Sequence, residues 1–187
     1  RLFDLYSGTS MSSPHVAGLG ALMKELHPDW SPMMIKSALM TTGSDILDGP
    51  NTNPLVIFRQ GAGHVRPNNA LDPGLVFDHS FNDWLAFLCG TSNGVGAATC
   101  NALRNLGYST DASDLNVASI AIGDMAGVQT VKRRVTNVGG AAATYTASLT
   151  GMAGFSVALP GAISIAPGET QSIEVSFQRT TATLNAY

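Results

Sequence analysis

The segment Gly8–Gly18 constrains this chain more than any other, because it places a serine at the start of a helix that is rich in small residues. Gly8 allows the backbone to turn sharply just before Ser10. Four small residues let the following helix lie close to neighbouring elements: Ala17, Gly18, Gly20 and Ala21. Ser10 would then sit at the positive end of a helix dipole, where free backbone N–H groups stabilise a developing oxyanion. The segment predicts a nucleophilic serine.

The same segment resembles the catalytic-serine motif of the subtilases, the subtilisin-like serine proteases. The resemblance continues through four further blocks, Leu26–Pro32, Lys36–Thr42, Gly61–Pro67 and Ala70–Asp78. These blocks are similar to the larger subtilases, including the plant type, that carry a fibronectin-III-like domain after the protease. The resemblance is strong to about Gly90 and looser beyond. It implies a serine endopeptidase that hydrolyses protein or peptide substrates through an acyl-enzyme on Ser10.

A serine hydroxyl is a weak nucleophile until a histidine takes its proton and a carboxylate orients that histidine. In subtilases the chain order is Asp, His, Ser, so the resemblance implies that both partners of Ser10 precede it. The segment Arg1–Tyr6 has no initiator Met and no signal-peptide pattern. We therefore expect this chain to be the C-terminal part of a protease that acts with its amino-terminal part and is inactive alone.

None of the four histidines carries a sequence signal for catalysis. His15 follows Ser10 by five residues, an offset that places the two on different faces of a helix. His27 stands at a helix end, where a ring near the last carbonyls is common. His64 in a glycine-rich loop and His79 before a helix are expected to be exposed or to hydrogen-bond the local backbone.

An α/β-hydrolase is the competing enzyme class, because its serine precedes its acid and its histidine. The nucleophile elbow of that class has the pattern G-x-S-x-G, whereas Gly8–Ser12 lacks the second glycine. No alternating strand and helix pattern follows that could return an acid and a histidine to Ser10. The pattern therefore favours the subtilase interpretation.

The first part of the chain is predicted to be mainly helical. Ser13 as cap and Pro14 as first residue is the local preference for the first helix, whereas the resemblance starts that helix near Ser10. Only a helix that starts near Ser10 places the Ser10 N–H in an oxyanion hole. Ser31 is expected to cap a second helix that stops before Gly43. Residues 48 to 78 are typical of a long connection, with a helical turn at 67–70, and a capped helix is predicted over 80–88.

Apolar residues cover a broad face of the first helix, at Val16, Leu19, Leu22, Met23 and Leu26. A face this wide predicts a helix buried in an α/β core. The expected fold class is therefore α/β for the first unit, as part of the three-layer catalytic domain of the subtilisin type.

After about Ser113 the hydrophobic period changes to two, as in the run Ile173, Val175 and Phe177. Further strands are predicted at 117–122, 128–135, 144–149 and 155–159. Short strands separated by turn residues predict an antiparallel β-sandwich, and the resemblance here is to a fibronectin-III-like domain. Val117–Ala118 stands where plant-type members have Tyr-Pro, so a bacterial relative fits as well as a plant one. We expect a peptidase part over 1–112 and a sandwich over 113–187 that lacks a terminal strand.

Composition is that of a secreted or extracellular globular protein. The net charge of -3 leaves no basic stripe for nucleic acid, and no apolar run approaches the ~18 residues that span a membrane.

Cys89 and Cys100 enclose a glycine-rich loop, which favours a disulfide over two buried thiols. Their spacing is too wide for a C-x-x-C zinc site, so no metal or cofactor is expected.

A second function stays open, in which the chain is catalytically inert and the β-sandwich acts as a binding or stabilising module. An intact motif around Ser10 favours catalysis, because an inert protease has no need to keep this hydroxyl.

Overall fold

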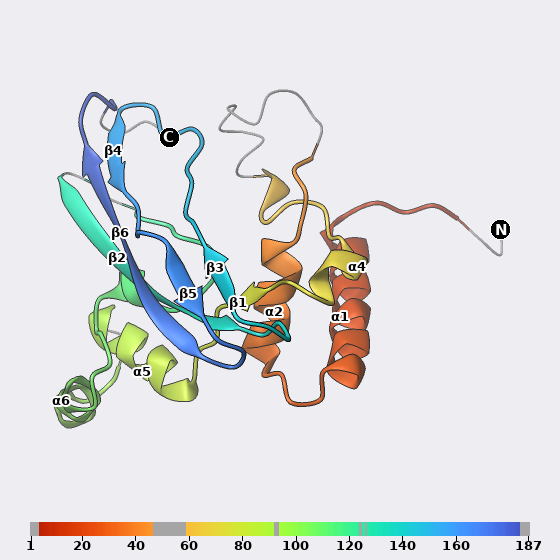
Figure 1. The fold of residues 1–187 in the computed structure, drawn as a ribbon, viewed down its shortest axis with the longest axis horizontal. Coiled ribbons are helices and arrows are strands. Elements are labelled where there is room, and N and C mark those ends of the chain that lie inside the picture. Colours follow the sequence, from red (N-terminus) through yellow and green to blue (C-terminus); the bar gives the residue numbers. More distant parts are fainter. Residues whose placement is uncertain (1–3, 47–58, 92–93, 124, 126, 184–187) are drawn as a thin grey trace.

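The structure is a computed structural model that describes residues 4–46, 59–91, 94–123, 125 and 127–183. Helices form most of the first half and strands most of the second (Figure 1). The helices are α1 (Thr9–Leu26), α2 (Pro32–Thr41), α4 (Pro67–Ala70), α5 (Phe81–Gly90), α6 (Ala97–Asn105) and the short 3-10 helix η1 (Ala112–Asp114). The strands are β1 (Leu75–Val76), β2 (Val128–Asn137), β3 (Ala143–Tyr145), β4 (Phe155–Ala158), β5 (Ile163–Ile165) and β6 (Thr170–Arg179).

The strands form an antiparallel four-stranded sheet in the order β1-β2-β6-β4 and a two-stranded sheet of β3 and β5. Val131 of β2 lies opposite Val175 of β6, and both Val131 and Val135 are buried. Alternate residues of β2 therefore face the interior, as period-two patterning requires. The predicted β-sandwich is confirmed.

One predicted strand, at 117–122, is wrong, because these residues are irregular. Side chains occupy the edge of β2 that such a strand would pair with. The Asp114 carboxylate accepts the Lys132 N–H at 2.8 Å, and the Asn116 carboxamide pairs with both the N–H and the carbonyl of Arg134 at 2.6 and 2.9 Å. The buried guanidinium of Arg133 donates to the carbonyls of this segment, at Ser113, Val117 and Ser119. The polar groups are thus satisfied without a backbone ladder.

Two other strand predictions need correction. Strand β3 is shorter than the predicted segment 144–149, and β5 was not predicted because three residues are too few to show a period.

The helical half has a hydrophobic core, against which the partly buried Val138 of the second half packs. Its buried members come from α1, α2, the turn after α1, α4 and β1: Met23, Ile35, Ala38, Trp30, Ala70 and Val76. Strand β1 also pairs with β2, with Leu75 opposite Asn137 and Val76 opposite Thr136. A strand that precedes residue 113 in the chain therefore belongs to the sheet of the second half.

The helix caps follow the sequence prediction. The Ser31 hydroxyl accepts the Met34 N–H at 3.0 Å, with Pro32 as first residue of α2. Ser80 and Asp83 form a complete capping box at the start of α5. The short helix α4 also lies where the sequence predicted it.

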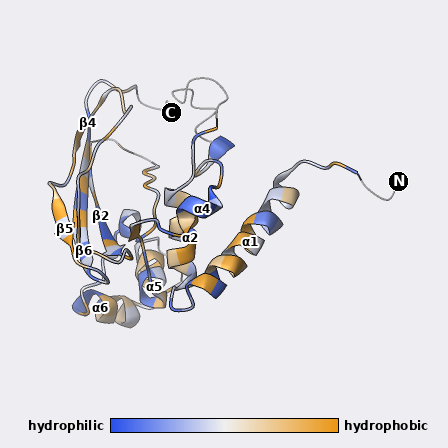
Figure 2. Cartoon of the chain, turned by 45° about the vertical axis from the view of Figure 1, so that its right-hand side comes forward, coloured by the Kyte–Doolittle hydropathy of each residue, from blue (hydrophilic) through white to orange (hydrophobic). Residues whose placement is uncertain are grey.

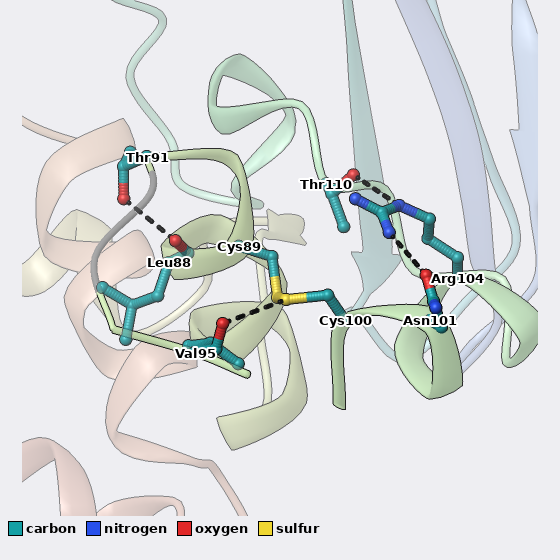
Figure 3. The surroundings of a disulfide bond; sticks show 8 residues. All are labelled: Leu88, Cys89, Thr91, Val95, Cys100, Asn101, Arg104 and Thr110. Carbon is teal, nitrogen blue, oxygen red and sulfur yellow. Dashed lines mark hydrogen bonds between the residues drawn. A yellow bond between two sulfur atoms is a disulfide. The ribbon is translucent and has the colours of Figure 1, made fainter. Parts of the chain in front are cut away.

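The disulfide between Cys89 and Cys100 is confirmed, with a Cα–Cα distance of 5.8 Å. It joins α5 to α6 (Figure 3). The sequence predicted a flexible loop here and missed α6. Of its residues, only Cys100 and Leu103 are buried. With so little apolar burial, α6 depends on the covalent link for its position.

Replacing both cysteines by serine should lower the free energy of unfolding by about 2–3 kcal/mol, since the closed loop no longer restricts the unfolded chain. Amide hydrogen exchange should also show loss of protection confined to α6. Denaturant titration and exchange mass spectrometry measure the two effects. Full stability and full protection of α6 in the double variant would contradict this role.

A buried polar junction also connects the halves. Asn116, which is 1 % exposed, donates to the Asp78 carbonyl at 2.6 Å and receives the His79 ring N–H on its own carbonyl at 3.0 Å. Arg134 of β2 forms an ion pair with Asp83 of α5 at 2.7 Å. Burial acts to raise the pKa of Asp83, yet hydrogen bonds from Arg134 and Ser80 outweigh it and lower that pKa below its usual value.

Because the folded-state pKa of Asp83 lies below the unfolded value of about 3.9, its contribution to stability is present above that value and is lost as the pH falls through the lowered pKa. Asp83→Asn should cost about 1–2 kcal/mol at neutral pH, since Arg134 is partly exposed, and should cost progressively less below about pH 4. Denaturant unfolding across pH measures this. Glu174→Gln is the control, because its ion pair with Lys132 is exposed, and a similar pH dependence there would contradict the assignment.

Candidate active-site serine

Helix α1 begins at Thr9, one residue before the candidate nucleophile, with Gly8 as its N-cap. The N–H groups of Met11 and Ser12 donate to the Gly8 carbonyl at 3.0 and 3.1 Å. Pro14 lies inside the helix, so the local preference for Ser13 as cap is wrong and a start near Ser10 is confirmed. A proline is tolerated this close to the start of a helix at the loss of one backbone bond.

Ser10 is exposed in the first turn of α1. Within the described residues, neither its hydroxyl nor its amide N–H has a hydrogen-bond partner. The first amides of a helix have no intrahelical acceptor, and the helix dipole adds partial positive charge at this end. Both groups are therefore available to a substrate that approaches the start of α1.

Gly8 holds the turn before the serine in a conformation that only glycine adopts readily. Its φ of 150° and ψ of 168° lie in a region that costs other residues about 1–3 kcal/mol. The backbone conformation is therefore what requires glycine at this position. Lack of space is not the reason, because a Cβ added to Gly8 would meet no atom within 4 Å.

The histidines are engaged elsewhere, as far as the structure describes them. The His15 ring donates to the Met11 carbonyl one turn back, and the His27 ring stacks on Trp30 with centroids 3.9 Å apart. His64 is exposed and its backbone pairs with Ser44. These positions agree with the predicted structural roles, and none of these rings hydrogen-bonds Ser10.

His79 is 8 % exposed, and its ring meets Trp84 edge-on at 5.1 Å. The carbonyl of Asn116 is an acceptor only, so Nδ1 of His79 donates to it. Nε2 is buried without a partner among the described residues. His79 is thus a structural residue of the junction.

Helix α1 is largely uncovered, and Met23 is its one buried residue. Leu22 and Leu26 are 57 % and 60 % exposed, and hydrophobic segments run along the helix at the edge of the molecule (Figure 2). A groove of about 590 Å³ lies between α1 and α2, and its lining includes Val16, Ile35 and Leu39. The prediction that α1 is buried is therefore wrong for this chain taken by itself. Large uncovered apolar surfaces mark interaction sites.

Within the described residues there is no cluster of three or more potential metal ligands among His, Cys, Asp and Glu. No helix in that part of the chain is long and apolar enough to cross a membrane.

Comparison with known proteins finds a family profile that matches in each half of the chain. The profile of the subtilase family matches residues 1–63, and that of a fibronectin type-III domain matches residues 114–187. The chain is 40% identical to the subtilisin-like protease SBT2.5 of Arabidopsis thaliana over 93% of its length. It belongs to the subtilase family.

Other subtilases show similar agreement. The chain is 37% identical to the subtilisin-like protease Glyma18g48580 of Glycine max over 96% of its length, and 42% identical to the subtilisin-like protease SBT3 of Solanum lycopersicum over 79%. It spans 23%, 24% and 21% of the lengths of these three relatives, respectively. All three are plant proteins, although Val117–Ala118 departs from the Tyr-Pro expected of that type.

Substituting Gly8 by alanine should weaken the first turn of the subtilase serine motif by about 1–3 kcal/mol, because the backbone conformation excludes a Cβ. Faster amide exchange at Met11 and Ser12, whose N–H groups bind the Gly8 carbonyl, would report the effect.

Gly18→Ala is the matched control, for which the expected change in helix stability has the opposite sign. Gly18 is an exposed interior residue of α1 with open space around it, so alanine should stabilise the helix by about 0.5–1 kcal/mol. Equal effects of the two substitutions on exchange at Met11 would contradict the strained-turn assignment.

Proposed function

We propose that this chain supplies the nucleophile of a subtilisin-like serine endopeptidase and that Ser10 is that nucleophile. The observation that supports this most directly is the free hydroxyl and free amide of Ser10 at the start of α1, behind a turn that requires Gly8. Membership of the subtilase family supports the reaction class.

In the proposed reaction the Ser10 oxygen attacks the carbonyl carbon of the scissile peptide bond while a histidine takes its proton. The carbonyl oxygen becomes an oxyanion, which the Ser10 N–H and the positive end of α1 stabilise. The tetrahedral intermediate collapses, the amine leaves with the proton from the histidine, and water then hydrolyses the acyl-enzyme. The substrates are proteins or peptides.

The histidine and the aspartate of the triad come from the amino-terminal part of the protease in this proposal, since none of the described histidines bonds Ser10. That part would also cover the uncovered face of α1 and the groove between α1 and α2. The exposed Leu22 and Leu26 support this arrangement, because a helix with one buried residue in eighteen gains little from packing in the chain alone.

We further propose that the whole protein is secreted or extracellular, where an oxidising environment would maintain the disulfide of Cys89 and Cys100. We also propose that the peptidase part covers residues 1–112 and the sandwich residues 113–187, and the fibronectin type-III match over residues 114–187 supports this division. The catalytically inert alternative stays a candidate for the isolated chain only.

Ser10→Ala in the whole protease should reduce peptide turnover to the background of the assay, because the group that forms the acyl-enzyme is gone. Ser13→Ala is the matched control: Ser13 lies in the same helix, is exposed and makes no hydrogen bond with the described residues through its hydroxyl. It should retain activity. Full turnover by purified Ser10→Ala enzyme would refute the assignment.

The chain by itself should not hydrolyse peptides, since the base for Ser10 is supplied from outside it. The measurement is cleavage of an unfolded protein by the chain alone and then in the presence of the amino-terminal part. Robust cleavage by the chain alone, blocked by a fluorophosphonate, would show that one of its own histidines acts as the base.

A further inference from the structure

A polar groove runs between the α5–α6 side of the molecule and the face of β2 and β6. It consists of two cavities of about 420 and 210 Å³. They share four lining residues, Asp83, Gly107, Asn116 and Arg134, and so adjoin each other. The larger cavity alone lies within the range of about 300–1,000 Å³ that is usual for small-molecule sites. No step of the proposed peptidase reaction uses it.

Pairs of polar side chains from β2 and β6 form the floor of this polar groove. The hydroxyls of Thr136 and Thr170 lie 2.7 Å apart, and Lys132 pairs with Glu174 at 3.4 Å. Ser172 lies between these pairs on β6 and is exposed. In a pair of hydroxyls joined by one hydrogen bond, one O–H is used in that bond and the other is free to donate. The floor therefore offers donors as well as acceptors.

Several groove side chains, on the floor and on the opposite wall, carry hydrogen-bonding atoms that have no partner within the described residues. These are the hydroxyl of Ser172 and Nε and Nη1 of Arg134 on the floor, and the hydroxyl of Tyr108 on the wall. Tyr108 and Leu106 both line the larger cavity. The groups left free are therefore a mixture of donors and acceptors next to a small apolar surface.

Carboxylates outnumber cations in the lining of the polar groove. Its acids are Asp78, Asp83, Asp111, Asp114 and Glu174, and its cations are Lys132, Arg133 and Arg134. Arg134 is bound to Asp83 and Lys132 to Glu174. The excess of negative charge disfavours a polyanion, and within the described residues no three potential metal ligands are grouped so that they could hold a metal ion. The polar lining also disfavours an apolar peptide, which would leave these groups without partners.

A neutral ligand that both donates and accepts hydrogen bonds along its length satisfies these conditions. Sugar hydroxyls do both, and the C–H face of a pyranose ring packs on an aromatic ring such as that of Tyr108. We propose that the polar groove binds a neutral oligosaccharide. This site lies on the β-sandwich side and does not depend on the chemistry proposed for Ser10.

The test titrates the isotope-labelled chain with neutral gluco-, galacto- and xylo-tetrasaccharides and follows backbone amide shifts. Saturable shifts should appear for at least one sugar and should cluster at residues 106–109, 132–136 and 170–174. Polygalacturonate and an unstructured peptide serve as the anionic and peptide probes.

Two substitutions remove free hydroxyls without breaking a hydrogen bond inside the described part of the protein. Tyr108→Phe and Ser172→Ala should each weaken sugar binding about threefold to tenfold while thermal unfolding stays unchanged. Tyr6→Phe and Ser156→Ala are the matched controls, because both residues are exposed and lie outside the polar groove. They should leave affinity unchanged.

Three results would overturn the proposal: no saturable shift with any neutral sugar, shifts that map outside the groove, or groove shifts with polygalacturonate or the peptide alone. Equal affinity of wild type and the Tyr108→Phe, Ser172→Ala double variant would also overturn it.

Discussion

The pairing of β1 with the end of β2 is the interaction on which the rest of this structure depends. Val76 is fully buried in the hydrophobic cluster that includes Met23 of α1 and Ala38 of α2, while its backbone lies opposite Thr136 of the sandwich. The two-residue strand β1 therefore contributes to the helical core, through Val76, and to the four-stranded sheet. Burial of the apolar side chain and satisfaction of the backbone groups occur together at this point, so the two halves fold against each other rather than as separate bodies.

Hydrogen bonds from α2 extend this connection toward the helix that carries the serine. The Ser31 hydroxyl donates to the Asp78 carboxylate at 2.6 Å, and the buried Ser37 hydroxyl accepts the Phe77 N–H at 2.9 Å. Helix α2 then packs on α1 through Ile35, whose side chain lies close to Gly20. The segment that follows β1 therefore fixes the position of α2, and α2 covers one side of α1. The other side of α1, with Leu22 and Leu26, is open in this chain.

Local signals in the sequence predicted the parts of the fold that local interactions decide. Ser31 before Pro32 and Ser80 before Asp83 predicted their helices because a cap needs only neighbouring residues. The prediction of a strand at 117–122 was wrong because contacts between residues distant in sequence, those of Asn116 with Arg134 and of Arg133 with Val117, take the place of strand pairing. Ser10 was identifiable from its motif, while its role stays a prediction. The burial of α1 was not predictable, since periodicity shows an apolar face and not what covers it.

The most direct test of the central claim is covalent. The whole protease is treated with a fluorophosphonate, which forms a stable adduct with an activated serine, and the adduct is located by peptide mass spectrometry. If Ser10 is the nucleophile and its activating histidine lies outside this chain, one adduct forms on the whole protease, at Ser10, and none forms on the isolated chain. An adduct on a different serine, or an active protease that is not labelled at Ser10, would contradict the assignment of Ser10.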